Sequence, residues 1–186
     1  MKKKISVAII VLLSFISVLF IYSLSKNKNV DNPQATQIPK IGASYNEITP
    51  NLSSKEDLYN KLGNPIKQNL INNSTVFEYK SNNPNYNDEF KIDSDKVVFI
   101  KKHITIDDNV DVKTLTEKYG QYKKMLYGPR SQSGFDLYIY NTKGIAYIGN
   151  QYTEDVTEIW YFPPTDLEIF KKLYAPEYSD IYNTKQ

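Results

Sequence analysis

Residues 53–65 read SSKEDLYNKLGNP, a stretch that carries both start and stop signals for a short helix. Ser53 can cap the helix, and Glu56, three residues later, completes a capping box in which each side chain bonds the other residue's backbone N–H. Gly63 supplies the left-handed residue that follows a last turn, and Pro65 cannot continue the hydrogen-bond ladder. The stretch therefore predicts a helix that ends at Gly63.

Three short strands are expected next, at residues 75–80, 86–92 and 96–104. The turn-rich segments 82–85 (NNPN) and 93–95 (DSD) separate them. Connections of this length are too short for a crossover helix, so the strands should form an antiparallel meander.

The same order of elements then begins again. Asp111 can cap a second helix that ends at Gly120, which lies 57 residues after Gly63. Three more strands are expected after it, at residues 135–141, 145–149 and 156–162. Repetition at this period predicts two copies of one α+β unit that share a continuous sheet or packing face.

A closing helix is expected after the last strand. Pro163 and Pro164 break that strand, and Thr165 with Glu168 forms another capping box. The apolar stripe of this helix should lie on the sheet and consists of Leu167, Phe170, Leu173 and Tyr174.

Near the N-terminus, residues 5–24 run from Ile5 to Leu24 without a charged residue. A helix of this length rises about 30 Å, the thickness of a bilayer's hydrocarbon core. Three lysines precede the run and two follow it, so the N-terminus should be cytoplasmic and the remainder extracytoplasmic. A cleaved secretory signal, with small residues at Ser23 and Ser25, is the alternative, and the domain would then be secreted.

The sequence as a whole predicts an α+β protein with an N-terminal transmembrane helix, two tandem helix-plus-antiparallel-meander units and a C-terminal helix. The expected parts are a cytoplasmic N-terminus (1–4), a transmembrane helix or signal anchor (5–25), a flexible linker (26–46), a first α+β repeat (47–106), a second α+β repeat with the closing helix (107–175) and a tail (176–186). The linker is polar and contains proline, so it cannot bury enough apolar area to offset its ordering entropy.

The charge balance argues against a nucleic-acid partner. Of the 23 Lys and Arg, six fall in the first 40 residues, and of the 21 Asp and Glu, one does, so the remaining 146 residues carry a net charge of −3. Nucleic-acid binding would need a clustered basic face. The absence of cysteine excludes disulfides and Cys-type zinc sites, and the 16 Tyr and 8 Phe predict an aromatic core on β-structure.

Four short motifs resemble the small-protein-A and outer-membrane-lipoprotein (BamE-like) family and the related β-lactamase-inhibitor-protein repeats; they lie at residues 49–51 (TPN), 55–58 (KEDL), 61–65 (KLGNP) and 77–79 (FEY). The resemblance covers residues 48–104 and, more loosely, 111–162. It implies a fold built for protein–protein contact and envelope assembly, without catalysis, and it carries over no functional residue. The lipidated cysteine of that family is missing here.

The usual signatures of catalysis and metal binding are weak. His103 is the only histidine, so we expect it to be an ordinary strand residue. Asp107, Asn109 and Asp111 imitate the first ligands of a calcium loop, but positions six and twelve of that loop hold Val and Lys instead of Gly and Glu. We therefore expect no catalysis, no metal and no cofactor.

Aromatic residues of the second unit offer a candidate contact face, because tyrosine and tryptophan bring large contact area at low entropy cost. The aromatic stretch also contains Tyr152, and the candidates for contact are Tyr138, Tyr140, Tyr147, Trp160 and Tyr161. The alternative is that the closing helix and the sister unit cover this face. We expect a cell-membrane protein, anchored through residues 5–24, whose outer domain binds another envelope protein; a module that binds cell-wall glycan or another polysaccharide is the alternative.

Overall fold

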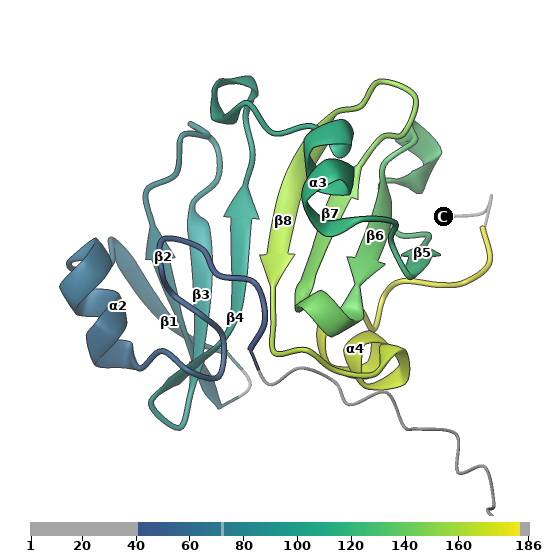
Figure 1. Ribbon diagram of the computed structural model, residues 1–186. Coiled ribbons are helices and arrows are strands. Elements are labelled where there is room, and N and C mark those ends of the chain that lie inside the picture. Colours follow the sequence, from purple (N-terminus) through teal and green to yellow (C-terminus); the bar gives the residue numbers. More distant parts are fainter. Residues whose placement is uncertain (1–40, 72, 183–186) are drawn as a thin grey trace, which may run out of the picture. The chain divides into compact units, whose positions relative to one another are not determined.

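The structure is a computed structural model that describes residues 41–71 and 73–182 (Figure 1). Its helices are α2 (Lys55–Leu62), α3 (Val112–Tyr119) and α4 (Leu167–Tyr174). Its strands are β1 (Lys67–Ile71), β2 (Ser74–Tyr79), β3 (Asp88–Asp93), β4 (Lys96–His103), β5 (Lys124–Leu126), β6 (Asp136–Tyr140), β7 (Ile145–Gly149) and β8 (Val156–Tyr161). Short 3-10 turns are η1 (Ile106–Asp108), η2 (Ser131–Ser133) and η3 (Asn141–Lys143).

The strands of the described residues form one antiparallel sheet in the order β1-β2-β3-β4-β8-β7-β6-β5. β4 and β8 join the two groups of four strands, with Lys101 opposite Trp160 in the register. One helix, α2 or α3, precedes each group in the sequence, and α4 comes last (Figure 1). The predicted α+β class and the antiparallel sheet are confirmed.

Each group has four strands where the sequence predicted three, because β1 and β5 were missed. β1 reads KQNLI and is an edge strand with four of its five residues exposed, so it lacks the alternation that marks a half-buried strand. β5 has only three residues, which is too short for a periodic pattern.

The first helix begins one residue later than predicted. Ser54, and not Ser53, is its N-cap: the Asp57 backbone N–H donates to Ser54 Oγ at 3.1 Å, and the Ser54 N–H donates to Asp57 Oδ2 at 2.7 Å. The predicted capping box therefore exists, but Ser54 and Asp57 form it in place of Ser53 and Glu56. The prediction that Asp111 caps the second helix is confirmed.

The closing helix α4 also differs from its prediction at two points. Asp166 is the N-cap and makes no side-chain cap bond, so the capping box expected at Thr165 and Glu168 is wrong. Phe170 is buried, as expected of the apolar stripe, but Leu173 is 57% exposed. The helix therefore buries a narrower stripe than the sequence suggests.

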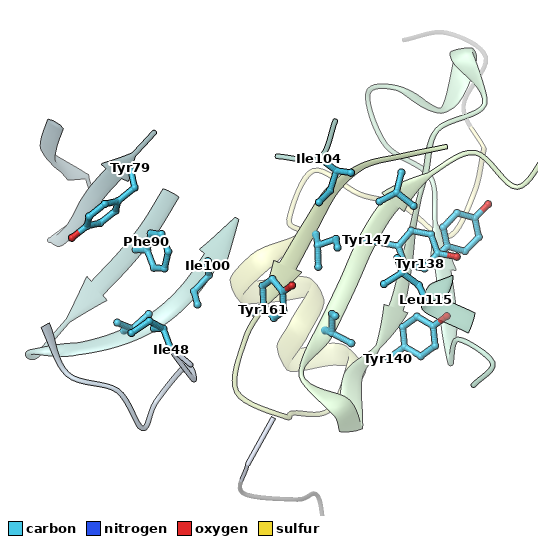
Figure 2. Packing of buried hydrophobic residues seen from close by; sticks show 14 of the residues in the cluster. Ile48, Tyr79, Phe90, Ile100, Ile104, Leu115, Tyr138, Tyr140, Tyr147 and Tyr161 are labelled. Carbon is cyan, nitrogen blue, oxygen red and sulfur yellow. The ribbon is translucent and has the colours of Figure 1, made fainter. Parts of the chain in front are cut away.

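The two faces of the sheet carry separate cores. On one face, α2, α3 and residues 43–48 cover a cluster that includes Phe90 and Leu115 (Figure 2). On the other, α4 and the segment after it cover β5 to β8, where the rings of Phe162 and Phe170 lie 4.6 Å apart. On this second face α4 reaches the first group of strands at β4, where the rings of Phe99 and Tyr174 stack at 5.3 Å, and no helix of the described residues packs over β1 to β3.

The described chain enters the domain at the end of the sheet where β7 begins. The Ala43 N–H donates to the carbonyl of Lys143, the residue two before β7, at 2.8 Å. Tyr45 then packs against Phe90 with ring centroids 6.1 Å apart. Residues 43–46, which the sequence placed in a flexible linker, are therefore packed on the sheet.

The predicted membrane segment at residues 5–25 lies outside the described residues, as do residues 26–40 of the predicted linker. Among the residues that the structure does describe, no helix has the length and apolar character needed to cross a bilayer.

Candidate functional site

The aromatic face predicted from the sequence is part of the core. Its members have exposed fractions of only 1–7%: Tyr138, Tyr140, Tyr147, Trp160 and Tyr161. Four of them share the face beneath α3, where the rings of Tyr138 and Tyr147 stack at 5.0 Å (Figure 2). Burial raises the pKa of Tyr147, so its hydroxyl stays protonated. The face that these four share is covered, as the alternative proposed, but by α3 and, at Tyr161, by Tyr45, and not by the closing helix.

Trp160 lies apart from the other four aromatic residues because side chains alternate along β8. Its ring packs edge-on against Phe99 and Tyr178, each at 5.7 Å, on the α4 side of the sheet. Its indole N–H donates to Glu158 Oε2 at 2.9 Å. None of these rings is free to stack on a sugar in this arrangement.

The candidate catalytic and metal-binding residues serve structural roles. His103 is 8% exposed, its ring stacks on Tyr86 at 5.0 Å, and burial lowers its pKa. Asp111 caps α3 by accepting the N–H of Thr114 at 2.6 Å. Within residues 41–71 and 73–182, no three His, Asp or Glu side chains gather in a way that could hold a metal ion.

A hollow of about 620 Å³ lies between the β4–α3 loop, residues 104–111, and the start of β8. Both ends of this loop are tied to the chain that leads into β8. The Ile104 N–H donates to the Thr157 carbonyl at 2.9 Å, and the Val112 N–H donates to the Glu154 carbonyl at 3.0 Å. The loop therefore arches away from the sheet between two fixed points.

This hollow, which we call the end hollow, lies at the end of the sheet opposite to the chain's entry. Ala43 is bonded to Lys143, before β7, whereas the hollow is lined by residues 153–157, after β7. The length of β7 therefore separates the two.

The wall of the end hollow is partly apolar and partly acidic. Its apolar side chains are Ile104, Ile106, Val110, Phe135 and Val156. Its carboxylates are Asp111, Glu154 and Asp155. No lysine or arginine belongs to the described wall.

Two large apolar side chains project from the loops that border the end hollow. Ile106, in η1, is 92% exposed, and Tyr152, in the turn between β7 and β8, is 96% exposed. Tyr152 belongs to the aromatic stretch of the second unit but was not among its candidates, and Ile106 was no candidate, because both stand in polar, turn-rich segments, 104–109 (ITIDDN) and 150–155 (NQYTED). A lone large apolar residue inside such a segment was the available signal, because burial explains it poorly there.

The loop that carries Ile106 is held by Asp108. One carboxylate oxygen, Oδ2, accepts the Thr105 N–H at 2.8 Å, and the other, Oδ1, pairs with Lys102 Nζ at 2.7 Å. Burial alone would raise the pKa of Asp108, but the hydrogen bonds from Lys102 and Thr105 and the charge of Lys102 together outweigh burial and lower the pKa. The carboxylate is therefore ionised at neutral pH and fixes the loop.

The turn that carries Tyr152 is held in a similar way by Asn150, a buried polar side chain. Asn150 Oδ1 accepts the backbone N–H of Tyr152 at 2.9 Å and that of Thr153 at 3.3 Å. Both exposed apolar side chains thus stand on loops whose backbones are already ordered, so little entropy remains to be lost on binding.

The uncovered half of the α4-side face is a weaker candidate. Its charges pair across strands, with Lys67 Nζ 3.2 Å from Glu78 and Lys101 Nζ 3.5 Å from Glu89. A depression of about 220 Å³ between Ile71 and α4 adds some apolar surface. Because the pairs satisfy the charges within the sheet, solvation explains this face without a partner.

Comparisons with known proteins add little. No family model matches the chain, and no curated protein matches it. Among solved structures, the chain is similar to that of YjgB, a DUF4309 family protein from Bacillus subtilis subsp. subtilis str. 168. The identity is 17%, the TM-score is 0.44, and the match covers 63% of this chain and 82% of the other. A likeness of this size assigns neither family nor function.

Proposed function

We propose that this chain is a cell-membrane protein, anchored through residues 5–24, whose extracytoplasmic domain binds another envelope protein through the end hollow, without catalysis. One observation carries the proposal: Ile106 and Tyr152, 92% and 96% exposed, stand on ordered loops beside a hollow at the end opposite to the chain's entry. Exposed apolar side chains are unfavourable in water, and a protein partner that buries them lowers the free energy.

Interface energetics support this reading of the two side chains. Binding energy concentrates in a few anchors, among which tyrosine is enriched, surrounded by contacts that exclude water. Tyr152 is such a ring, and the hollow, whose wall includes the next residue, Thr153, offers both apolar and polar groups to the same partner. Anchors on rigid loops also avoid the entropy cost of ordering them.

We further propose that the two helix-and-strand groups are tandem copies of one unit, consistent with the BamE-like resemblance. What supports the proposal is their common order and matching ends: α2 stops at Gly63 with φ 76°, and α3 stops at Gly120 with φ 82°. In both helices, the backbone N–H of this glycine donates a hydrogen bond to the carbonyl of the residue four positions earlier. α4 has no counterpart after β4.

The experiment that tests the function is affinity purification of the tagged chain from detergent-solubilised envelopes. The double variant Ile106→Ser/Tyr152→Ser removes the anchors, and Ile169→Ser/Tyr182→Ser removes one exposed Ile and one exposed Tyr elsewhere. We expect one envelope protein to be recovered with the unaltered chain and with the control, and lost with the first variant. Equal recovery with both variants, or retention on insoluble cell wall in place of a protein partner, contradicts the proposal.

A further inference from the structure

We propose that the partner segment that enters the end hollow is a basic polypeptide segment, one that carries lysine or arginine next to an apolar side chain. The inference rests on the proposed function and names the chemistry of its partner. It starts from the charges of the wall, whose described lining holds three carboxylates and no lysine or arginine.

The carboxylates of the wall differ in how far the domain itself satisfies them. Asp111 accepts two hydrogen bonds from Thr114, both at 2.6 Å, and these bonds lower its pKa. Asp155 accepts only the hydroxyl of Thr153, at 2.6 Å. The carboxylate of Glu154 is exposed and has no partner among the described residues. Negative charge is therefore left over at the mouth of the hollow.

Two nearby lysines do not cancel this charge. Lys113, in the first turn of α3, adds to the Thr114 hydrogen bonds in lowering the pKa of Asp111, but it forms no ion pair among the described residues. Lys102 is engaged with Asp108 at 2.7 Å, and the side chains of this pair are only 13% and 10% exposed. Asp107, in the same η1 turn as Ile106, is exposed and adds a further acid. An anionic partner would meet repulsion at this end of the domain, whereas a cationic one would be steered toward it.

The apolar part of the wall fits the same occupant. Lysine and arginine bury their aliphatic stems along apolar surface while the charged head stays hydrated or paired. Val110, Phe135 and Val156 can receive such a stem or a neighbouring apolar side chain, with the Glu154 and Asp155 carboxylates at the rim for the head group. One basic segment would therefore use both kinds of wall.

Fluorescence anisotropy with two labelled probe peptides tests the inference on the full chain in neutral detergent. One peptide is rich in lysine with a central phenylalanine, and the other carries glutamate in place of each lysine. We expect the lysine peptide to bind, more weakly as salt rises from about 50 to about 300 mM, and the glutamate peptide not to bind. Binding of both peptides alike, or of neither, overturns the inference.

Three variants locate the binding. Glu154→Lys with Asp155→Asn should weaken the lysine peptide about tenfold or more, since attraction becomes repulsion. Glu168→Lys, an exposed glutamate on α4, is the matched control and should leave binding unchanged. Glu154→Gln alone should give a smaller loss, and it keeps the test decisive if the double variant folds poorly. An unchanged affinity in both Glu154 variants overturns the inference.

The same charge variants separate this inference from the proposed function. If Glu154→Lys with Asp155→Asn leaves recovery of the envelope partner unchanged while Ile106→Ser/Tyr152→Ser abolishes it, the partner is not basic but the end hollow remains the binding surface. If the anchor variant also leaves recovery unchanged, the proposed function itself is wrong.

Discussion

Tyr45 Oη donates a hydrogen bond to Asp88 Oδ2 at 2.9 Å and so fastens the segment that enters the domain to the first residue of β3. Asp88 is 2% exposed, and its other oxygen accepts the His103 N–H at 2.9 Å. The Tyr45 ring also stacks on the rings of Phe90 and Tyr161, with centroids 6.1 and 5.9 Å apart. The entering segment is therefore fixed to the core by a hydrogen bond and by ring contacts.

Tyr45→Phe should destabilise the domain more at neutral than at acid pH. Burial raises the pKa of Asp88 above its usual 3.8, so this group contributes stability below that value and loses it as pH rises through the raised pKa. The Tyr45 bond lowers the pKa, and its loss leaves an ionised buried carboxylate less satisfied, at a cost of about 1–3 kcal/mol. Urea unfolding from pH 3 to 8 measures this; a loss that is equal at every pH contradicts it.

Alanine should be far better tolerated at Gly63 than at Gly144, although both have positive φ, 76° and 67°. A Cβ on Gly63 meets nothing within 4 Å, so Gly63→Ala costs only the left-handed backbone, about 1–2 kcal/mol. A Cβ on Gly144 would lie 2.3 Å from the Phe162 carbonyl oxygen, and the clash should raise the cost above about 3 kcal/mol. Denaturant unfolding of the two variants compares the costs, and equal costs would refute the role of the clash.

Acid should release the C-terminal segment. Asp180 sits between Lys124, whose Nζ is 2.6 Å from Oδ1, and Lys171, and hydrogen bonds from these two lysines lower its pKa to about 2. Because its pKa is lowered, the Asp180 carboxylate contributes to stability at pH values above its usual pKa of 3.8, and this contribution is lost as the pH falls toward 2.

Amide hydrogen exchange at Tyr127 and Ser179, whose N–H groups bond each other's carbonyls at 2.8 Å, reports this release. Corrected for the intrinsic effect of pH, protection should fall between pH 4 and 2. Asp180→Asn should show the lower protection already at neutral pH. Full protection at neutral pH in that variant would contradict the prediction.

Glu154→Gly should raise stability while it weakens binding of the basic probe peptide. Glu154 holds a left-handed φ of 61°, which costs a residue with a Cβ about 1–2 kcal/mol. Glycine relieves that strain, but it also raises the entropy of the unfolded chain, which lowers stability by about 0.4–1 kcal/mol. The net gain in stability should therefore be about 0.5–1 kcal/mol. Glu154→Gln is the control, with unchanged stability but the same loss of charge; thermal unfolding and anisotropy measure both. A glycine variant that is less stable than the unaltered chain would contradict the inference that the Glu154 backbone is strained.

Asp108→Ala should loosen the Ile106 loop. It removes the partner of Lys102 and leaves the Thr105 N–H unsatisfied in a half-buried site, at a cost of about 2–4 kcal/mol. Asp107→Ala, at an exposed neighbour, should stay within about 0.5 kcal/mol. Chemical unfolding gives both values, and similar values for the two variants would show that Asp108 does not hold the loop.

The local signals in the sequence predicted the fold well where they involve neighbouring residues. Gly63, Gly120 and Asp111 end or begin helices as predicted, and β7 has the predicted bounds. β1 was missed because an exposed edge strand needs no alternating pattern.

The site could not be predicted in the same way. Alternation shows that Tyr138 and Tyr140 share a face, but not that α3 lies over it. The end hollow joins residues 104–111 with 153–157, which the β4–β8 pairing and the backbone hydrogen bonds beyond it bring together. The sequence of neither segment predicts that it contacts the other.

A photo-crosslinking amino acid at position 152, in intact cells that make the full chain, tests the central claim most directly. We expect an adduct with one envelope protein from position 152, a weaker one in the Ile106→Ser background, and none from position 169 on α4. Adducts of equal yield from both positions, or no adduct from position 152, would contradict binding at the end hollow.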